Sequence, residues 1–140
     1  VWKGKLIIKG IQTVEDAKQL AKIGVDAIIL SNHGGRQLDK SVVPLEILPE
    51  VRKAVGKKGK GTQIYIDGAI MSGADVLAAV ALGADAVLIG RAYLYGAMAA
   101  GREGVQKVVN TLRFEMETAM KLMGARNIDE LTPEFVSIRK

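Results

Sequence analysis

The sequence predicts an α/β fold in which four βα units with parallel strands form the C-terminal half of a (β/α)₈ barrel. The chain has 140 residues, of which 49% are hydrophobic and only 4% aromatic, a mixture that suits helices packed on a sheet. Short apolar runs alternate with longer segments of helical character along the whole chain. A complete barrel needs about 250 residues. We therefore interpret residues 1–140 as one half-barrel domain.

An internal repeat supports this architecture. The segment Gly24–Leu30 matches Gly83–Ile89 at an offset of 59 residues, and the same offset pairs Thr13 with Ser72. The two hydroxyl residues are expected N-caps of helices, and the glycine that opens each matching run is expected to end the helix before it. The apolar runs that follow are short and β-branched, as buried parallel strands are.

The elements expected from these patterns follow in order along the chain. Strands are predicted near Leu6–Lys9, Ala27–Leu30, Ile64–Asp67 and Ala86–Ile89, and helices near Val14–Ile23, Pro44–Val55, Ala74–Leu82 and Val105–Met123. The alternative is a small doubly wound sheet. The sequence has no Gly-x-Gly-x-x-Gly after a strand, which argues against a dinucleotide-binding version.

The charge and the composition of the chain limit the kinds of binding partner that the sequence allows. The net charge is +5, and several of the basic residues are the lysines at 53, 57, 58 and 60. A solvated helix face and a basic loop explain them most simply, with an anionic membrane surface or nucleic acid as alternatives. No aromatic residues interleave with these lysines, so we predict no nucleic-acid partner. The absence of cysteine excludes disulfides and thiolate metal sites and allows a cytosolic location.

Polar and glycine residues gather where each predicted strand ends. They are Lys9-Gly10, the segment Ser31-Asn-His-Gly-Gly-Arg-Gln-Leu-Asp39, Asp67-Gly68 and Gly90-Arg91. In a β/α barrel the carboxyl ends of the strands carry the active site. We therefore expect the functional residues at this rim.

His33 and Arg36 are the candidate catalytic pair. His33 is the only histidine and follows a predicted buried strand between polar and glycine residues. A lone histidine is more often structural or solvated, but an imidazole can also take a proton near neutral pH. Arg36 has a planar fork that suits a carboxylate. A base beside a carboxylate clamp suggests an α-substituted acid as substrate.

Other rim residues suggest a bound cofactor. Lys9 could form a Schiff base, stabilise a negative charge on a cofactor ring or lie on the surface. Asp67 could accept hydroxyl groups of a sugar-like chain or simply pair with Lys9. If the last two strands are barrel strands seven and eight, the loops after them occupy the phosphate site common in this fold. The groups that could bind a phosphate there are Gly68, Ser72, Gly73, Gly90 and Arg91.

These residues resemble the FMN-dependent 2-hydroxy-acid dehydrogenases and oxidases, a family that includes lactate dehydrogenases, glycolate oxidases and mandelate dehydrogenases. The resemblance covers essentially the whole chain, and its most specific part is the segment 31–39. It implies FMN as cofactor, His33 as the base and Arg36 as the ligand of the substrate carboxylate. It also implies a flavin site made of Lys9, Ser31, Asp67, Gly68, Ala69, Met71, Gly90 and Arg91, without a metal ion.

The chain departs from the family pattern at one place. Many members read Asp-Gly-Gly-Val-Arg-Arg-Gly where this chain has Asp67-Gly-Ala-Ile-Met-Ser-Gly73. Met71 and Ser72 stand where arginines would be, which puts one phosphate contact in doubt. This variant resembles the bacterial L-lactate dehydrogenase branch and its relatives in mycofactocin maturation.

The resemblance implies oxidation of an L-2-hydroxy acid, most simply L-lactate to pyruvate, with a quinone, a cytochrome or oxygen as electron acceptor. His33 would take either the hydroxyl proton, as the α-hydrogen leaves as hydride, or the α-proton. The alternatives are a flavin enzyme of mycofactocin maturation and an inactive half-barrel that binds phosphate or a partner. For the full-length form we expect a homo-oligomer in the cytoplasm or at the inner face of the membrane. We expect the isolated chain to be inactive, because part of the substrate pocket is missing. We also expect it to pair with the missing half or with a second copy rather than stay a monomer, because two sheet edges, near Leu6–Lys9 and Ala86–Ile89, lack their partners.

Overall fold

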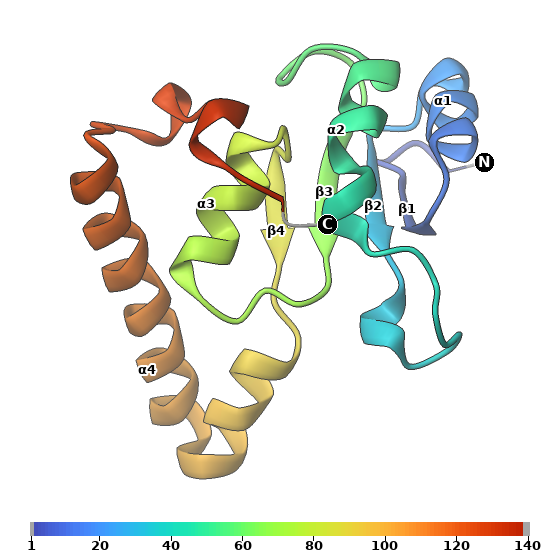
Figure 1. Ribbon diagram of the computed structural model, residues 1–140. Coiled ribbons are helices and arrows are strands. Elements are labelled where there is room, and N and C mark those ends of the chain that lie inside the picture. Colours follow the sequence, from blue (N-terminus) through green and yellow to red (C-terminus); the bar gives the residue numbers. More distant parts are fainter. Residues whose placement is uncertain (1, 139–140) are drawn as a thin grey trace.

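The computed structural model describes residues 2–138 as one parallel sheet with helices packed against it (Figure 1). The strand order is β1-β2-β3-β4. The strands are β1 (Ile7–Ile11), β2 (Ala27–Ser31), β3 (Gln63–Asp67) and β4 (Ala86–Leu88), and the helices are α1 (Val14–Ile23), α2 (Pro44–Val55), α3 (Gly73–Ala81) and α4 (Arg91–Met123).

The prediction of four parallel βα units is confirmed. Each strand pairs in parallel with the next strand of the chain, and β1 and β4 form the two edges. Among residues 2–138, no helix has both the length and the apolar character needed to cross a bilayer.

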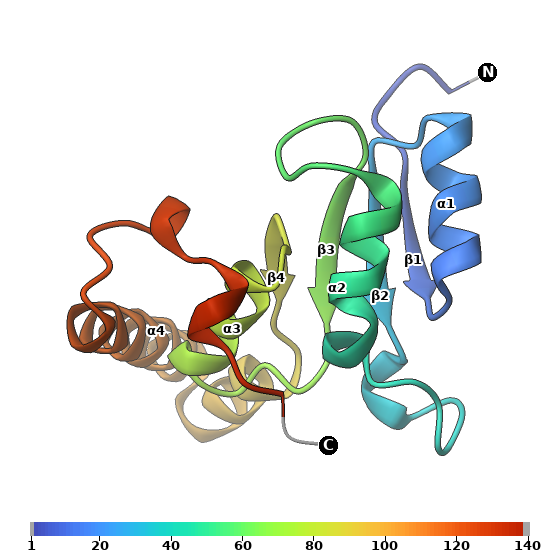
Figure 2. The ribbon, with the colours of Figure 1, turned by 45° about the horizontal axis from the view of Figure 1, so that its top comes forward.

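The core lies between the sheet and the helices, and Figure 2 shows α1 and α2 side by side against it. Ile28 and Leu30 of β2 and Ile64 and Ile66 of β3 are fully buried in this layer. Because side chains alternate along a strand, Lys9, Ser31 and Asp67 belong to the opposite face, which is the inner face of a barrel. Ile7, on that same inner face, is 47% exposed.

Five of the eight strand boundaries differ from the prediction, four of them by one residue and the end of β1 by two. β1 does not stop at Lys9 but continues to Ile11, through an irregularity in its pairing with β2 at Gly10, where φ is +98°. A bulge of this kind bends a strand and re-aims its neighbouring side chains, and only the paired structure reveals it. β4 ends at Leu88, one residue earlier than predicted.

The last helix differs more. The sequence predicted a helix from Val105, but α4 begins at Arg91 and breaks at Ala100 and Gly101, where the backbone is not helical. The two segments fold against each other, as Figure 1 shows, and they touch at Gly96 and Gly104. A Cβ atom on Gly104 would lie 1.8 Å from the Gly96 carbonyl oxygen, so this contact requires glycine.

The predicted helix caps are confirmed. The Thr13 hydroxyl accepts from the Asp16 N–H at 3.1 Å, and Ser72 forms a reciprocal capping box with Asp75. Gly24 is the left-handed C-cap of α1, with φ of +81°. Gly83, its repeat mate, lies one residue beyond the C-cap of α3 and also has positive φ.

Candidate active site

A cavity of about 340 Å³ opens at the carboxyl ends of the strands. It brings together side chains and backbone from the ends of all four strands, as the fold predicts for an active site. Of the site residues expected from the sequence, those that line it are Lys9, His33, Arg36, Asp67, Gly68, Ala69, Met71, Gly90 and Arg91. Ser31 lines an adjoining hollow of about 400 Å³, which also contains Lys9 and His33.

Lys9, Ser31 and Asp67 form a hydrogen-bonded cluster across three neighbouring strands. The Lys9 ammonium forms an ion pair with Asp67 and donates to the Ser31 hydroxyl at 2.9 Å. The Ser31 hydroxyl in turn lies 2.9 Å from Asp67 Oδ2. Ser31 and Asp67 are direct partners in the β2–β3 pairing, which places both side chains on the inner face. Pairing of Asp67 with Lys9, one of the two roles expected, is therefore present.

The loop after β2 has an unusual backbone. His33, Gly34 and Gly35 all have positive φ, at +55°, +66° and +72°. Asn32 holds this turn, because its side-chain oxygen accepts from the Gly35 N–H at 3.3 Å. Strained residues of this kind concentrate at functional sites. The turn presents His33 and Arg36 to the same cavity, as the motif predicted.

The start of α3 already has acceptors for its N–H groups. The N–H groups of Met71 and Ser72 donate to Asp75 Oδ2 at 3.0 and 2.8 Å. The Gly73 N–H donates at 2.7 Å to Glu115, which comes from α4. These three donors are therefore engaged within the chain. The expectation that Ser72 and Gly73 bind a phosphate gains no support here.

The start of α4 is different. Its N-cap is Gly90, which has no side chain to accept from the first-turn N–H groups. A Cβ atom built on Gly90 would meet nothing within 4 Å, so the space beside it is open. The Nη2 atom of Arg91 lies 3.9 Å from the position of a Cβ on Gly34, and therefore reaches the loop after β2. Uncapped N–H groups and a guanidinium together suit an anion.

A larger hollow, of about 510 Å³, lies at the opposite end of the sheet. It is lined by Lys5, Asp26 and Gln63, among others, and by none of the predicted site residues. In the described part of the chain, no group of three or more His, Asp and Glu side chains is placed to hold a metal ion.

Sequence reasoning missed Tyr93 and Leu94, which line the cavity from the first turn of α4. It missed them because it placed this segment outside any helix. The signal was present, since a glycine followed by Arg-Ala-Tyr-Leu directly after a buried strand is compatible with a helix that starts at the rim. Glu115 was also missed, because its contact with Gly73 spans 42 residues.

Comparison with known proteins gives a consistent result. The model of the family described as FMN-dependent dehydrogenase matches residues 1–138. A putative L-lactate dehydrogenase of Mycobacterium tuberculosis is 51% identical over 136 residues, which are 97% of this chain and 32% of that protein. The pre-mycofactocin synthase of Mycolicibacterium smegmatis is 42% identical over 137 residues, 98% of this chain and 34% of that protein.

A solved structure agrees. The monotopic membrane protein (S)-mandelate dehydrogenase superposes with a TM-score of 0.91 at 39% identity, over 99% of this chain and 36% of that one. The chain thus spans about a third of the length of the relatives it matches.

Proposed function

Because this chain belongs to the FMN-dependent dehydrogenase family, we propose that it supplies the base and most of the flavin site of an enzyme that oxidises an L-2-hydroxy acid to a 2-oxo acid. The observation that carries this proposal is the single cavity that His33, Arg36, Lys9 and Arg91 share, although they come from three different strands, β1, β2 and β4. L-lactate is the proposed substrate, since a relative named as a lactate dehydrogenase is 51% identical.

We assign different tasks to His33 and Arg36. The imidazole of His33 accepts a proton from the substrate, because histidine exchanges protons near neutral pH. The guanidinium of Arg36 holds the substrate carboxylate with two parallel hydrogen bonds. Because both residues lie on one short turn, a carboxylate bound to Arg36 brings the α-carbon of the same molecule near His33.

The residues of the cavity suit FMN. When bound, FMN accepts the two electrons that the substrate loses. Lys9 supplies a fixed positive charge that stabilises negative charge on a ring beside it. The uncapped start of α4 and the Arg91 guanidinium suit a phosphate, and Gly90 leaves the space beside the backbone open. Since the N–H groups at the start of α3 are engaged, we assign the phosphate to Gly90 and Arg91, with Met71 and Ala69 contributing to the wall.

A second candidate is modification of a peptide in a cofactor pathway. It is favoured by the 42% identity to a pre-mycofactocin synthase. The two candidates differ in substrate, because a peptide does not offer the small free hydroxy acid that the Arg36 clamp would select. Reduction of the flavin by L-lactate but not by the peptide would favour the dehydrogenase.

The experiment uses the full-length enzyme, purified with its native cofactor. We expect a flavin spectrum, release of FMN on extraction and chromatography, and bleaching of the flavin by L-lactate under anaerobic conditions. D-lactate is the matched control, and (S)-mandelate and glycolate test the width of the substrate class. Recovery of FAD or a nicotinamide nucleotide, or a flavin that no 2-hydroxy acid reduces, would contradict the proposal.

Peripheral membrane association is proposed separately. It is supported by the similarity to a monotopic membrane protein, (S)-mandelate dehydrogenase. Fractionation of cells should place the full-length enzyme in the membrane pellet at low salt and in the supernatant at high salt if charge holds it there. The electron acceptor and the homo-oligomeric state stay predictions from the sequence.

A further inference from the structure

The hydroxyl of Ser31 forms hydrogen bonds to three other residues beside the cavity. Ser31 is 2% exposed. Its Oγ donates to Asp67 at 2.9 Å and accepts from the Lys9 ammonium at 2.9 Å and from the His33 N–H at 3.0 Å. A serine hydroxyl has one donor and two acceptor positions. All three positions are therefore used by groups of the chain itself.

The backbone that Ser31 holds is strained. His33 has φ of +55°, in the left-handed region, and the two glycines after it also have positive φ. A residue with a Cβ adopts this conformation only where its surroundings impose it. Asn32 fixes the end of the turn through the Gly35 N–H. The bond from the His33 N–H to Ser31 fixes its beginning.

We propose that Ser31 is a positioning residue for His33. It ties the backbone of the base, which follows β2, to the Lys9–Asp67 ion pair formed by the two flanking strands. The base and the cation beside the cofactor are thereby held in one fixed relation. This inference rests on the proposed function, and it concerns the bond from Ser31 to the His33 backbone rather than the place of Ser31 in the flavin site.

The first test is Ser31→Ala in the full-length holoenzyme. We expect flavin reduction by L-lactate, measured per bound FMN in anaerobic stopped flow, to slow by roughly 10- to 100-fold, because small displacements of reacting groups are costly. Because this rate is measured per bound FMN, it reports the action of Ser31 on His33 separately from any change in the Kd for FMN. Ser31→Thr, which keeps the hydroxyl, should react faster than Ser31→Ala. Ser137→Ala, an exposed serine outside the cavity, is the matched control and should match the parent.

The second test is a double-mutant cycle. If Ser31 acts through His33, then adding Ser31→Ala to His33→Gln should cost no further rate. A third readout does not depend on activity. Hydrogen exchange of the peptide that contains the His33 amide should be faster in Ser31→Ala than in the parent apoprotein, and Ser31→Thr should restore the slow exchange.

Several outcomes would overturn the inference. They are a parental reduction rate in Ser31→Ala, a raised Kd for FMN at an unchanged rate, or a full additional loss on the His33→Gln background. If Ser31→Ala does not fold, Ser31→Cys replaces it, because a thiol of similar size is only a weak acceptor. If the parent flavin is reduced by no 2-hydroxy acid, the proposed function fails. The hydrogen-exchange comparison then still decides whether Ser31 holds His33.

Discussion

The two ends of the sheet each carry a cation–carboxylate pair that joins different elements, yet the pairs differ in environment. At the amino ends of the strands, Arg52 pairs with Asp85, and their side chains are 13% and 9% exposed. At the carboxyl ends, Lys9 pairs with Asp67, and their side chains are 43% and 18% exposed. The same chemistry is thus enclosed at one end and open to a cavity at the other.

The pair at the amino ends is saturated. Asp85 accepts from Arg52, from the Ile64 N–H at 2.8 Å and from the Gly59 N–H at 3.2 Å. Arg52 also donates through Nε to the Gly83 carbonyl at 2.8 Å. A buried pair with so many partners fixes the packing of the chain and has little capacity left for a ligand.

The pair at the carboxyl ends retains capacity. Lys9 has three donors, and hydrogen bonds to Asp67 and Ser31 use two of them. Lys9 and Asp67 also line the cavity. The comparison teaches that spare hydrogen-bonding capacity beside the cavity, rather than charge pairing itself, separates the Lys9–Asp67 pair at the functional end of this sheet from the Arg52–Asp85 pair at the structural end.

The largest expected effect is the loss of stability when the ion pair at the structural end is broken. Asp85→Asn leaves Arg52 nearly buried without its counter-charge, which should lower the free energy of unfolding by about 3–5 kcal/mol. Urea denaturation of the full-length enzyme measures it, with the exposed Asp129→Asn as matched control. The rate of flavin reduction per bound FMN should stay parental. A loss below about 1 kcal/mol would place this pair with ordinary surface pairs.

The next largest effect is on the reaction rate at the functional end, with little change in stability. His33→Gln should slow flavin reduction by roughly 100-fold or more, as expected for loss of a general base. The free energy of unfolding should change by less than about 1 kcal/mol, because His33 is exposed. Stopped-flow reduction and urea denaturation of the same preparation test both statements. A parental rate would remove His33 from the role of base.

Arg36→Lys should act on binding more than on the chemical step. Lysine keeps the charge but cannot reproduce the two-pronged geometry, so we expect the apparent Kd for L-lactate to rise roughly tenfold. The limiting rate of reduction at saturating substrate should fall much less. The dependence of the reduction rate on L-lactate concentration separates the two, and an unchanged Kd would argue against the clamp.

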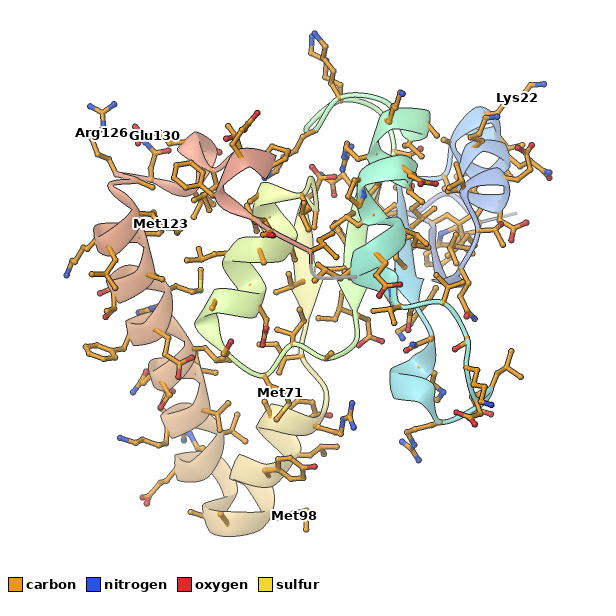
Figure 3. The ribbon with its side chains drawn as sticks, viewed as in Figure 1. Lys22, Met71, Met98, Met123, Arg126 and Glu130 are labelled. Carbon is orange, nitrogen blue, oxygen red and sulfur yellow. The ribbon has the colours of Figure 1, made fainter. Side chains whose placement is uncertain are left out.

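Met71→Arg should strengthen the binding of FMN at the functional end. Met71 lines the cavity on the loop after β3, near the first segment of α4 in Figure 3. An arginine there restores the cation that the family pattern has, and we expect FMN to bind a few-fold more tightly, by roughly 1 kcal/mol or less. Fluorescence titration of apoprotein with FMN measures the Kd. Met98→Arg, at an 83% exposed position outside the cavity, is the control.

The smallest expected effect on stability comes from the ion pair between Lys5 and Asp26, because this pair is exposed. Asp26 is the residue that matches Asp85 in the internal repeat. The hydrogen bond from Lys5 and that from the Leu6 N–H lower the pKa of Asp26. A lowered folded-state pKa contributes stability above the ordinary value, near 4, and that contribution is lost as pH falls through the folded-state pKa.

Asp26→Asn tests this small contribution. The difference in Tm between the parent and the variant should therefore be present at pH 6 and shrink below about pH 4. Thermal unfolding at a series of pH values measures the difference. A difference that is the same at pH 6 and pH 3 would show that charge is not its source.

The sequence by itself determined the elements and the chemistry at the rim. Thr13 and Ser72 marked helix starts, because a cap is a local hydrogen bond between residues three apart. The apolar runs marked the strands within one or two residues at most ends, because burial of a short β-branched run is readable from its composition. The positions of His33 and Arg36 in one cavity followed from the rule that strand ends converge.

Only the tertiary structure decided which polar groups are still available. The N–H groups at the start of α3 are engaged because Glu115 reaches Gly73 from 42 residues away. The break in α4 brings Gly96 against Gly104, and β1 continues through Gly10 only because β2 pairs with it. Ser31 joins Lys9, Asp67 and His33 through contacts between different strands. Sequence periodicity reports the neighbours of a residue along one helix or strand, whereas the saturation of a hydrogen-bonding group depends on partners that approach from elsewhere in the chain.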